Sequence, residues 1–186
     1  DEQELRNLMY TASLDETKSL GQAFTIRYPR GEGVMSAWRT PLEKVEIGKG
    51  RKIQDGEDVA ILTVGPVGNY AMTACRQLEL DGLSVAHYDL RFVKPLDADL
   101  LHEVFRKFDK VITVEDGCVM GGFGSAVAEF MLDQGYSARL RRLGIPDRVV
   151  EHGEQIELHR ECGFDPDGIA DAVRALVFEG LKSLTV

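Results

Sequence analysis

Residues 58–64 read DVAILTV, an almost unbroken apolar run, and Gly65-Pro66 follows directly. A run of this length bounded by turn residues is typical of a β-strand that is buried on both faces. Beyond it the spacing predicts a helix that ends at Gly82, and residues 83–89 read as the next strand. One stripe of that helix is apolar, with Ala71, Met72, Cys75 and Leu78.

The alternation of strand and helix continues to the end of the chain. Asp97 is a suitable N-cap, residues 111–114 and 137–143 read as strands, and Asp165-Pro166 begins a last helix. The helices between them carry apolar stripes, with Leu100, Leu101, Val104, Phe105 and Phe108 in one and Val127, Phe130 and Met131 in the other. Such alternation predicts a three-layer α/β domain with a mostly parallel sheet, over residues 41–186.

The first 40 residues do not fit that domain. Residues 1–13 read as a helix, residues 23–28 as a strand that ends at Pro29, and residues 29–57 as a linker rich in Gly and charge. A lone strand cannot satisfy its backbone groups, so residues 1–40 are expected to be a helix–strand remnant of a neighbouring domain. We expect the strand to pack on a second copy of the chain or on the edge of its own sheet.

Composition excludes several classes of protein. The 186 residues include 22 Lys+Arg and 31 Asp+Glu, a net charge of −9, which disfavours nucleic-acid and anionic-membrane surfaces. No stretch approaches the roughly 20 apolar residues of a membrane span. The acidic N-terminus is unlike a signal peptide, and the absence of an initiator Met suggests a fragment. Three scattered cysteines suggest a reducing, cytoplasmic compartment.

Ligands of open α/β sheets collect at the carboxyl ends of the strands, where Arg91 follows residues 83–89. Its guanidinium is suited to a phosphate or carboxylate, but from the residues alone an ion pair with Asp89 or Asp97 is the favoured explanation. Arg27 and Arg30 flank a rigid turn, where an anion contact and a solvated strand exit are both open.

The segment GGFGS at residues 121–125 lies between a strand and a helix. It lacks the third glycine of a dinucleotide fingerprint and the P-loop lysine, so a tight turn is favoured over a phosphate cradle. Glu115-Asp116 could serve in acid–base chemistry, but adjacent carboxylates most often cap the turn that follows, and that role is expected. The four histidines lack metal-ligand spacing, and no catalytic or metal site is predicted from these residues.

Six strings occur in order along the chain. They are IRYPRG at 26–31, PLE at 41–43 with IGKG at 47–50, DLRFVKPLD at 89–97, TVED at 113–116, GGFGS at 121–125 and LGIPD at 143–147. Together they resemble 1-deoxy-D-xylulose-5-phosphate synthase, from the last helix of its middle, pyrimidine-binding domain through its transketolase-type C-terminal domain.

The resemblance implies a transferase that depends on thiamine diphosphate and Mg²⁺. The family condenses pyruvate with D-glyceraldehyde 3-phosphate, with loss of CO2, in the methylerythritol phosphate pathway of isoprenoid biosynthesis, and its product also feeds thiamine and pyridoxal biosynthesis. The resemblance also implies that the enzyme is a homodimer in the cytoplasm. By resemblance, Arg27 and Arg91 match the two arginines that hold the phosphate of the aldehyde substrate.

The family's metal-binding segment and its ring-activating glutamate belong to parts that are not in this sequence, and Glu115 does not match that glutamate. We therefore expect the chain alone to be inactive and to bind no cofactor or metal, because the cofactor carries the chemistry. Two alternatives stay open. One is a non-catalytic assembly domain of another transketolase-like or 2-oxo-acid dehydrogenase enzyme, and the other is a nucleotide-binding domain.

Overall fold

The apolar run at residues 58–64 forms the central strand β2 (Val59–Val64), in which five of six residues are buried. The sheet has the order β1-β3-β2-β4-β5, and only β1 and β3 are antiparallel. The other strands are β1 (Arg51–Gln54), β3 (Val85–Asp89), β4 (Lys110–Cys118) and β5 (Arg139–Ile145). This computed structural model describes residues 1–29, 31–35 and 37–178.

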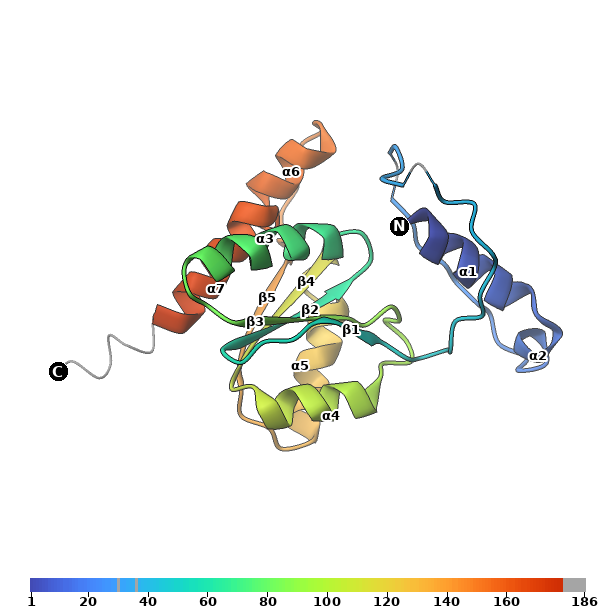
Figure 1. The fold of residues 1–186 in the computed structure, drawn as a ribbon, viewed down its shortest axis with the longest axis horizontal. Coiled ribbons are helices and arrows are strands. Elements are labelled where there is room, and N and C mark those ends of the chain that lie inside the picture. The colour runs from blue at the N-terminus through green and yellow to red at the C-terminus, as the bar shows by residue number, and fades with distance from the viewer. Residues whose placement is uncertain (30, 36, 179–186) are drawn as a thin grey trace. The chain divides into compact units, whose positions relative to one another are not determined.

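Helices cover both faces of the sheet (Figure 1). On one face lie α3 (Gly68–Leu80) and α7 (Pro166–Phe178), and on the other lie α4 (Ala98–Lys107) and α5 (Phe123–Asp133). A short helix, α6 (Gln155–Glu161), precedes α7. Each face has its own buried apolar cluster, one around Ile61 and Ile169 and the other around Leu62 and Leu101. The predicted three-layer α/β fold with a mostly parallel sheet is confirmed.

Two predicted helix starts are also confirmed. Asp97 caps α4, because its carboxylate accepts a hydrogen bond from the backbone N–H of Leu100 at 3.1 Å. Asp165 accepts one from the N–H of Gly168 at 3.0 Å, at the start of α7. Each carboxylate satisfies an N–H that has no partner inside its helix.

Some predicted elements are wrong. Met72 is exposed, and Ala74 takes its place on the buried stripe of α3. Residues 51–54, expected to be linker, form β1, and α6 was not expected. Both are short elements without a clear apolar period, and β1 is an edge strand with only one neighbour.

The chain divides into two compact units, Asp1–Ile47 and Gly48–Val186. The first contains α1 (Glu2–Ser13), which confirms the expected helix, and α2 (Asp15–Lys18). Residues 23–28 pair with no strand in the described part of the chain, and the sheet contains no strand from them. The expected strand and its pairing with the sheet edge are therefore wrong, and the packing of this segment on a second copy of the chain stays a prediction.

Side chains of α1 instead bind backbone groups of residues 34, 35, 38, 40, 43 and 45. Glu2 accepts from the N–H groups of residues 34 and 35 at 2.8 and 3.0 Å. Arg6 donates to the carbonyls of residues 38 and 40 at 2.8 and 2.9 Å, and the Thr11 hydroxyl accepts from the N–H of Val45 at 2.8 Å. This unit is therefore ordered by helix-to-backbone hydrogen bonds. That residues 1–40 are the tail of a middle domain stays a prediction.

Candidate functional site

Arg91 lies at the carboxyl edge of the sheet, two residues after the end of β3, as predicted. It is partly buried, and its φ of 55° lies in the left-handed region, which residues with a side chain rarely adopt. Its backbone N–H donates to Asp89 Oδ1 at 3.1 Å. The side chain therefore leaves the sheet edge from an unusual and locally fixed backbone position.

Asp89 and Asp97, the two carboxylates that could pair with Arg91, accept hydrogen bonds from other residues. Asp89 Oδ2 accepts from Nε and Nη2 of Arg51, at 3.2 and 3.0 Å. Asp97 accepts from the N–H of Gly50 at 2.9 Å and from the N-terminus of α4. Lys49 lies 3.4 Å from Asp97 and 2.7 Å from Asp99. The loop at residues 89–97 is thus tied at both ends to residues 49–51.

Arg27 is exposed and belongs to the first compact unit, whereas Arg91 belongs to the second. Arg30, the other cation of the predicted turn, lies outside the described residues. That Arg27 and Arg91 share one phosphate stays a prediction.

The glycine loop is a turn held by Glu115. This carboxylate is buried within β4 and accepts from the N–H groups of Phe123 and Gly124, each at 2.8 Å. A side chain at Gly122 would collide with Glu115 and with the carbonyl of Cys118, which explains the glycine. The chain's own anion therefore occupies the N-terminus of α5. The predicted tight turn and the capping role of Glu115 are confirmed.

Asp116, its neighbour, takes part in a second cluster at the same edge. His159 of α6 is buried, with Nδ1 3.3 Å from the Tyr70 hydroxyl and Nε2 3.8 Å from Asp116 Oδ1. Burial lowers the pKa of His159, and the charges of Asp116 and Asp165 oppose that shift. The cluster connects α3, α6 and β4, so the imidazole ties α6 to the sheet edge. Sequence spacing alone pointed to no role for His159, because its partners come from distant segments.

A second histidine, His87, lies inside the sheet layer. It is 1% exposed, and its Nε2 is 2.9 Å from the Thr63 hydroxyl on the neighbouring strand. Burial lowers its pKa to about 4, while Asp89 raises it and Arg51 lowers it further. The ring is therefore neutral near pH 7, which is the cheaper state for a buried imidazole.

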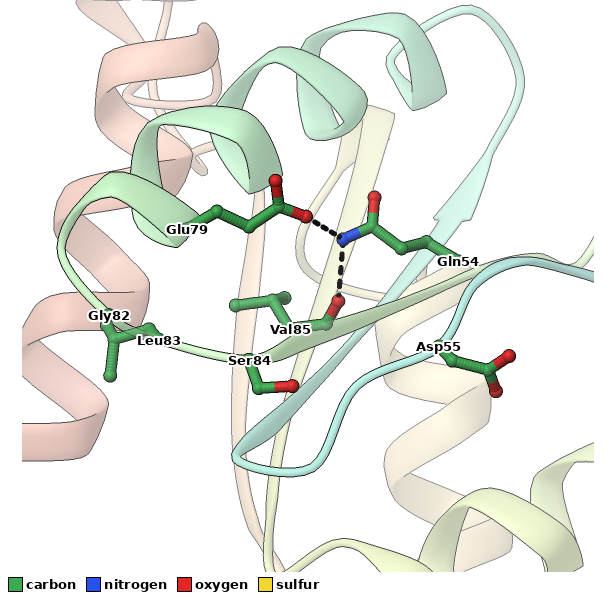
Figure 2. A pocket seen from close by; sticks show the side chains of 7 residues that line it. All are labelled: Gln54, Asp55, Glu79, Gly82, Leu83, Ser84 and Val85. Atoms are coloured by element: carbon green, nitrogen blue, oxygen red, sulfur yellow. Dashed lines mark hydrogen bonds between the residues drawn. The ribbon is translucent and has the colours of Figure 1, made fainter.

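Two hollows in the surface lie away from Arg91. One, of about 260 Å³, lies where β3 begins, and Figure 2 shows that Gln54, one of its polar groups, pairs with Glu79 and Val85. There Gln54 Nε2 donates to Glu79 at 2.9 Å and to the carbonyl of Val85 at 3.1 Å. The other, of about 300 Å³, lies between the ends of α4 and α5 and includes Phe105 and Tyr136. Neither presents a convergent set of groups for chemistry.

The family model "Transketolase, C-terminal domain" matches residues 48–169, and the match begins where the second compact unit begins. The chain belongs to this family. Curated relatives of this transketolase C-terminal domain are 1-deoxy-D-xylulose-5-phosphate synthases. That of Cytophaga hutchinsonii is 64% identical over 176 residues, which are 95% of this chain and 27% of the relative. That of Bacteroides fragilis is 52% identical over 91% of this chain and 26% of the relative.

A solved structure described as a split gene transketolase, inactive β4 tetramer, is also similar. It is 30% identical with a TM-score of 0.68, over 73% of this chain and 44% of that one. The resemblance to the synthase family that the six strings predict is thus confirmed. The chain spans about a quarter of the length of the curated relatives it matches.

The described residues of this chain do not fit a metal or diphosphate site. Within residues 1–29, 31–35 and 37–178, no group of three or more His, Cys, Asp or Glu is arranged to hold a metal ion. The glycine loop at the start of α5, which most resembles an anion cradle, is filled by Glu115. In the described part of the chain, no helix is both long and apolar enough to cross a membrane.

Proposed function

We propose that this chain is the C-terminal part of a 1-deoxy-D-xylulose-5-phosphate synthase and that Arg91, together with Arg27, holds the phosphate of D-glyceraldehyde 3-phosphate. Identity of 64% to the Cytophaga hutchinsonii enzyme over 95% of the chain supports the assignment. The observation that carries the phosphate role is the position of Arg91 at the carboxyl edge, in a loop tied down at both ends.

In this proposal the two arginines orient the substrate. Two parallel hydrogen bonds from a guanidinium fit a phosphate, and holding that end fixes the direction of the aldehyde carbon toward the reacting partner, pyruvate. The residues of this chain perform no bond-making step. Thiamine diphosphate and Mg²⁺ are bound by other parts of the enzyme, so the chain alone is inactive and binds neither.

The full enzyme in this proposal is a cytoplasmic homodimer of the methylerythritol phosphate pathway, and residues 41–186 contribute to its assembly. The three cysteines, Cys75, Cys118 and Cys162, are free, which is consistent with a reducing compartment.

A chimera tests the proposal. This chain replaces the matching 27% of the Cytophaga hutchinsonii synthase, and product formation from pyruvate and D-glyceraldehyde 3-phosphate is measured. We expect the chimera to form 1-deoxy-D-xylulose 5-phosphate and the isolated chain to form none. A folded, dimeric chimera without product contradicts the proposal.

Arg91→Ala in the chimera separates substrate binding from pure assembly. We expect a loss in use of the aldehyde far greater than in use of pyruvate, with the dimer intact. Arg76→Ala, which removes an exposed arginine of α3, is the matched control. A broken dimer with unchanged aldehyde kinetics favours the assembly alternative.

A further inference from the structure

The backbone of Arg91 adopts a conformation that a neighbouring side chain stabilises. Its φ of 55° is one that residues with a side chain seldom adopt without support. The support comes from Asp89 Oδ1, which accepts from the Arg91 N–H at 3.1 Å, two residues along the chain. An aspartate that bonds the backbone two residues on is a recognised way of closing a turn.

The Asp89 carboxylate is itself fixed. Its other oxygen, Oδ2, accepts from Nε and Nη2 of Arg51, a contact made by two nitrogens of one guanidinium. Arg51 lies directly opposite Asp89 in the antiparallel register of β1 and β3. The Asp89 side chain is 17% exposed, so its carboxylate is partly shielded from water, whereas the Arg51 side chain is 41% exposed. Rotation of the carboxylate away from Arg91 would break the Arg51 contact.

The far end of the loop is fixed to the same strand. Asp97 caps α4 and also accepts from the backbone N–H of Gly50, the residue before β1. The two aspartates of the string DLRFVKPLD lie on either side of Arg91 in the sequence. Asp89 binds Arg51, and Asp97 binds Gly50. The loop is closed against β1 by two independent contacts.

We infer that Asp89 and Arg51 are positioning residues for Arg91, which set its backbone before substrate arrives. The inference rests on the proposed phosphate role of Arg91. A preformed loop avoids part of the entropic cost of ordering a side chain on binding, so the pair affects affinity for the phosphorylated substrate. Asp89, the first residue of the string DLRFVKPLD, thus has a role, and so does β1, which sequence analysis did not predict.

The test uses Asp89→Ala in the chimera. We expect the KM for D-glyceraldehyde 3-phosphate to rise about tenfold, as for loss of a preformed binding loop, with kcat and the KM for pyruvate little changed. Asp89→Asn keeps an oxygen for the Arg91 N–H but loses the charge, and is expected to restore part of the affinity. Lys52→Ala, which removes an exposed β1 side chain paired with Asp55, is the matched control. If Asp89→Ala does not fold, the KM of Asp89→Asn for D-glyceraldehyde 3-phosphate decides: a rise supports the positioning role, and an unchanged KM refutes it.

A double variant separates the two levels of the proposal. Arg91→Ala combined with Asp89→Ala is expected to be no worse than Arg91→Ala alone, because Asp89 acts through Arg91. If Arg91→Ala impairs aldehyde use while Asp89→Ala and Asp89→Asn do not, the positioning role is refuted and the proposed function stands. If Arg91→Ala itself has no effect, the phosphate role fails.

Discussion

Glu115→Gln tests whether the glycine loop is held by the chain's own carboxylate. Glu115 is 6% exposed, and its two oxygens accept separate N–H groups, from Phe123 and Gly124, at 2.8 Å each. A glutamine has one acceptor oxygen, and its NH2 group would face the second N–H donor. The substitution keeps the volume and removes one hydrogen bond and the charge.

The expected cost follows from these contacts. A hydrogen bond to a charged group contributes about 1.5–3 kcal/mol. Removing a negative charge from a partly or fully buried helix N-terminus costs up to about 2 kcal/mol more. Because the two effects overlap, the free energy of unfolding should fall by about 2–4 kcal/mol.

Urea unfolding of the 186-residue chain, followed by circular dichroism, measures this loss. Glu129→Gln is the matched control, because Glu129 is exposed on the same helix, and its effect should stay within about 0.5 kcal/mol. If Glu115→Gln costs no more than Glu129→Gln, Glu115 does not hold the loop and the glycine segment is open to an external anion.

Three further predictions concern stability. Burial lowers the pKa of His87 from 6.5 to about 4, so protonation favours the unfolded chain. The free energy of unfolding should fall by up to about 3 kcal/mol as the pH drops from 6.5 to 4. Urea unfolding of His87→Gln over the same pH range should lack this pH dependence. Thr11→Val leaves the N–H of Val45 without its acceptor, and hydrogen exchange of that amide should accelerate about tenfold or more, whereas unchanged exchange refutes the helix-to-backbone contact. Asp97→Ala should cost about 1–3 kcal/mol in urea unfolding and Asp99→Ala, at an exposed ion pair, under about 1 kcal/mol; equal costs refute the double role of Asp97.

Strong apolar runs and caps made most of the sheet and helices predictable. The run at 58–64 and the cap at Asp97 each act within a few residues, so local sequence is enough to place them. The strand β1 was missed because its four residues, RKIQ, are mostly polar, and its pairing with β3 is an interaction across 38 residues between Arg51 and Asp89. The strand expected at 23–28 is wrong for the opposite reason: its local pattern suits a strand, but the described sheet does not include these residues.

The site was predictable in part. The position of Arg91 at a strand end follows from the order of strands and loops alone, but the partners of Asp89 and Asp97 depend on β1, which sequence did not reveal. Glu115 was expected to cap a turn, and it does, whereas the contact of Asp116 with His159 joins segments too far apart to foresee.

The most direct test of the phosphate role compares two aldehydes in the chimera, D-glyceraldehyde 3-phosphate and unphosphorylated D-glyceraldehyde. We predict that Arg91→Ala lowers kcat/KM about ten- to a hundredfold for the phosphorylated aldehyde, as for loss of one charge-assisted contact, and leaves the unphosphorylated one unchanged. An equal loss of kcat/KM for both aldehydes, or no loss for either, would contradict the phosphate role of Arg91.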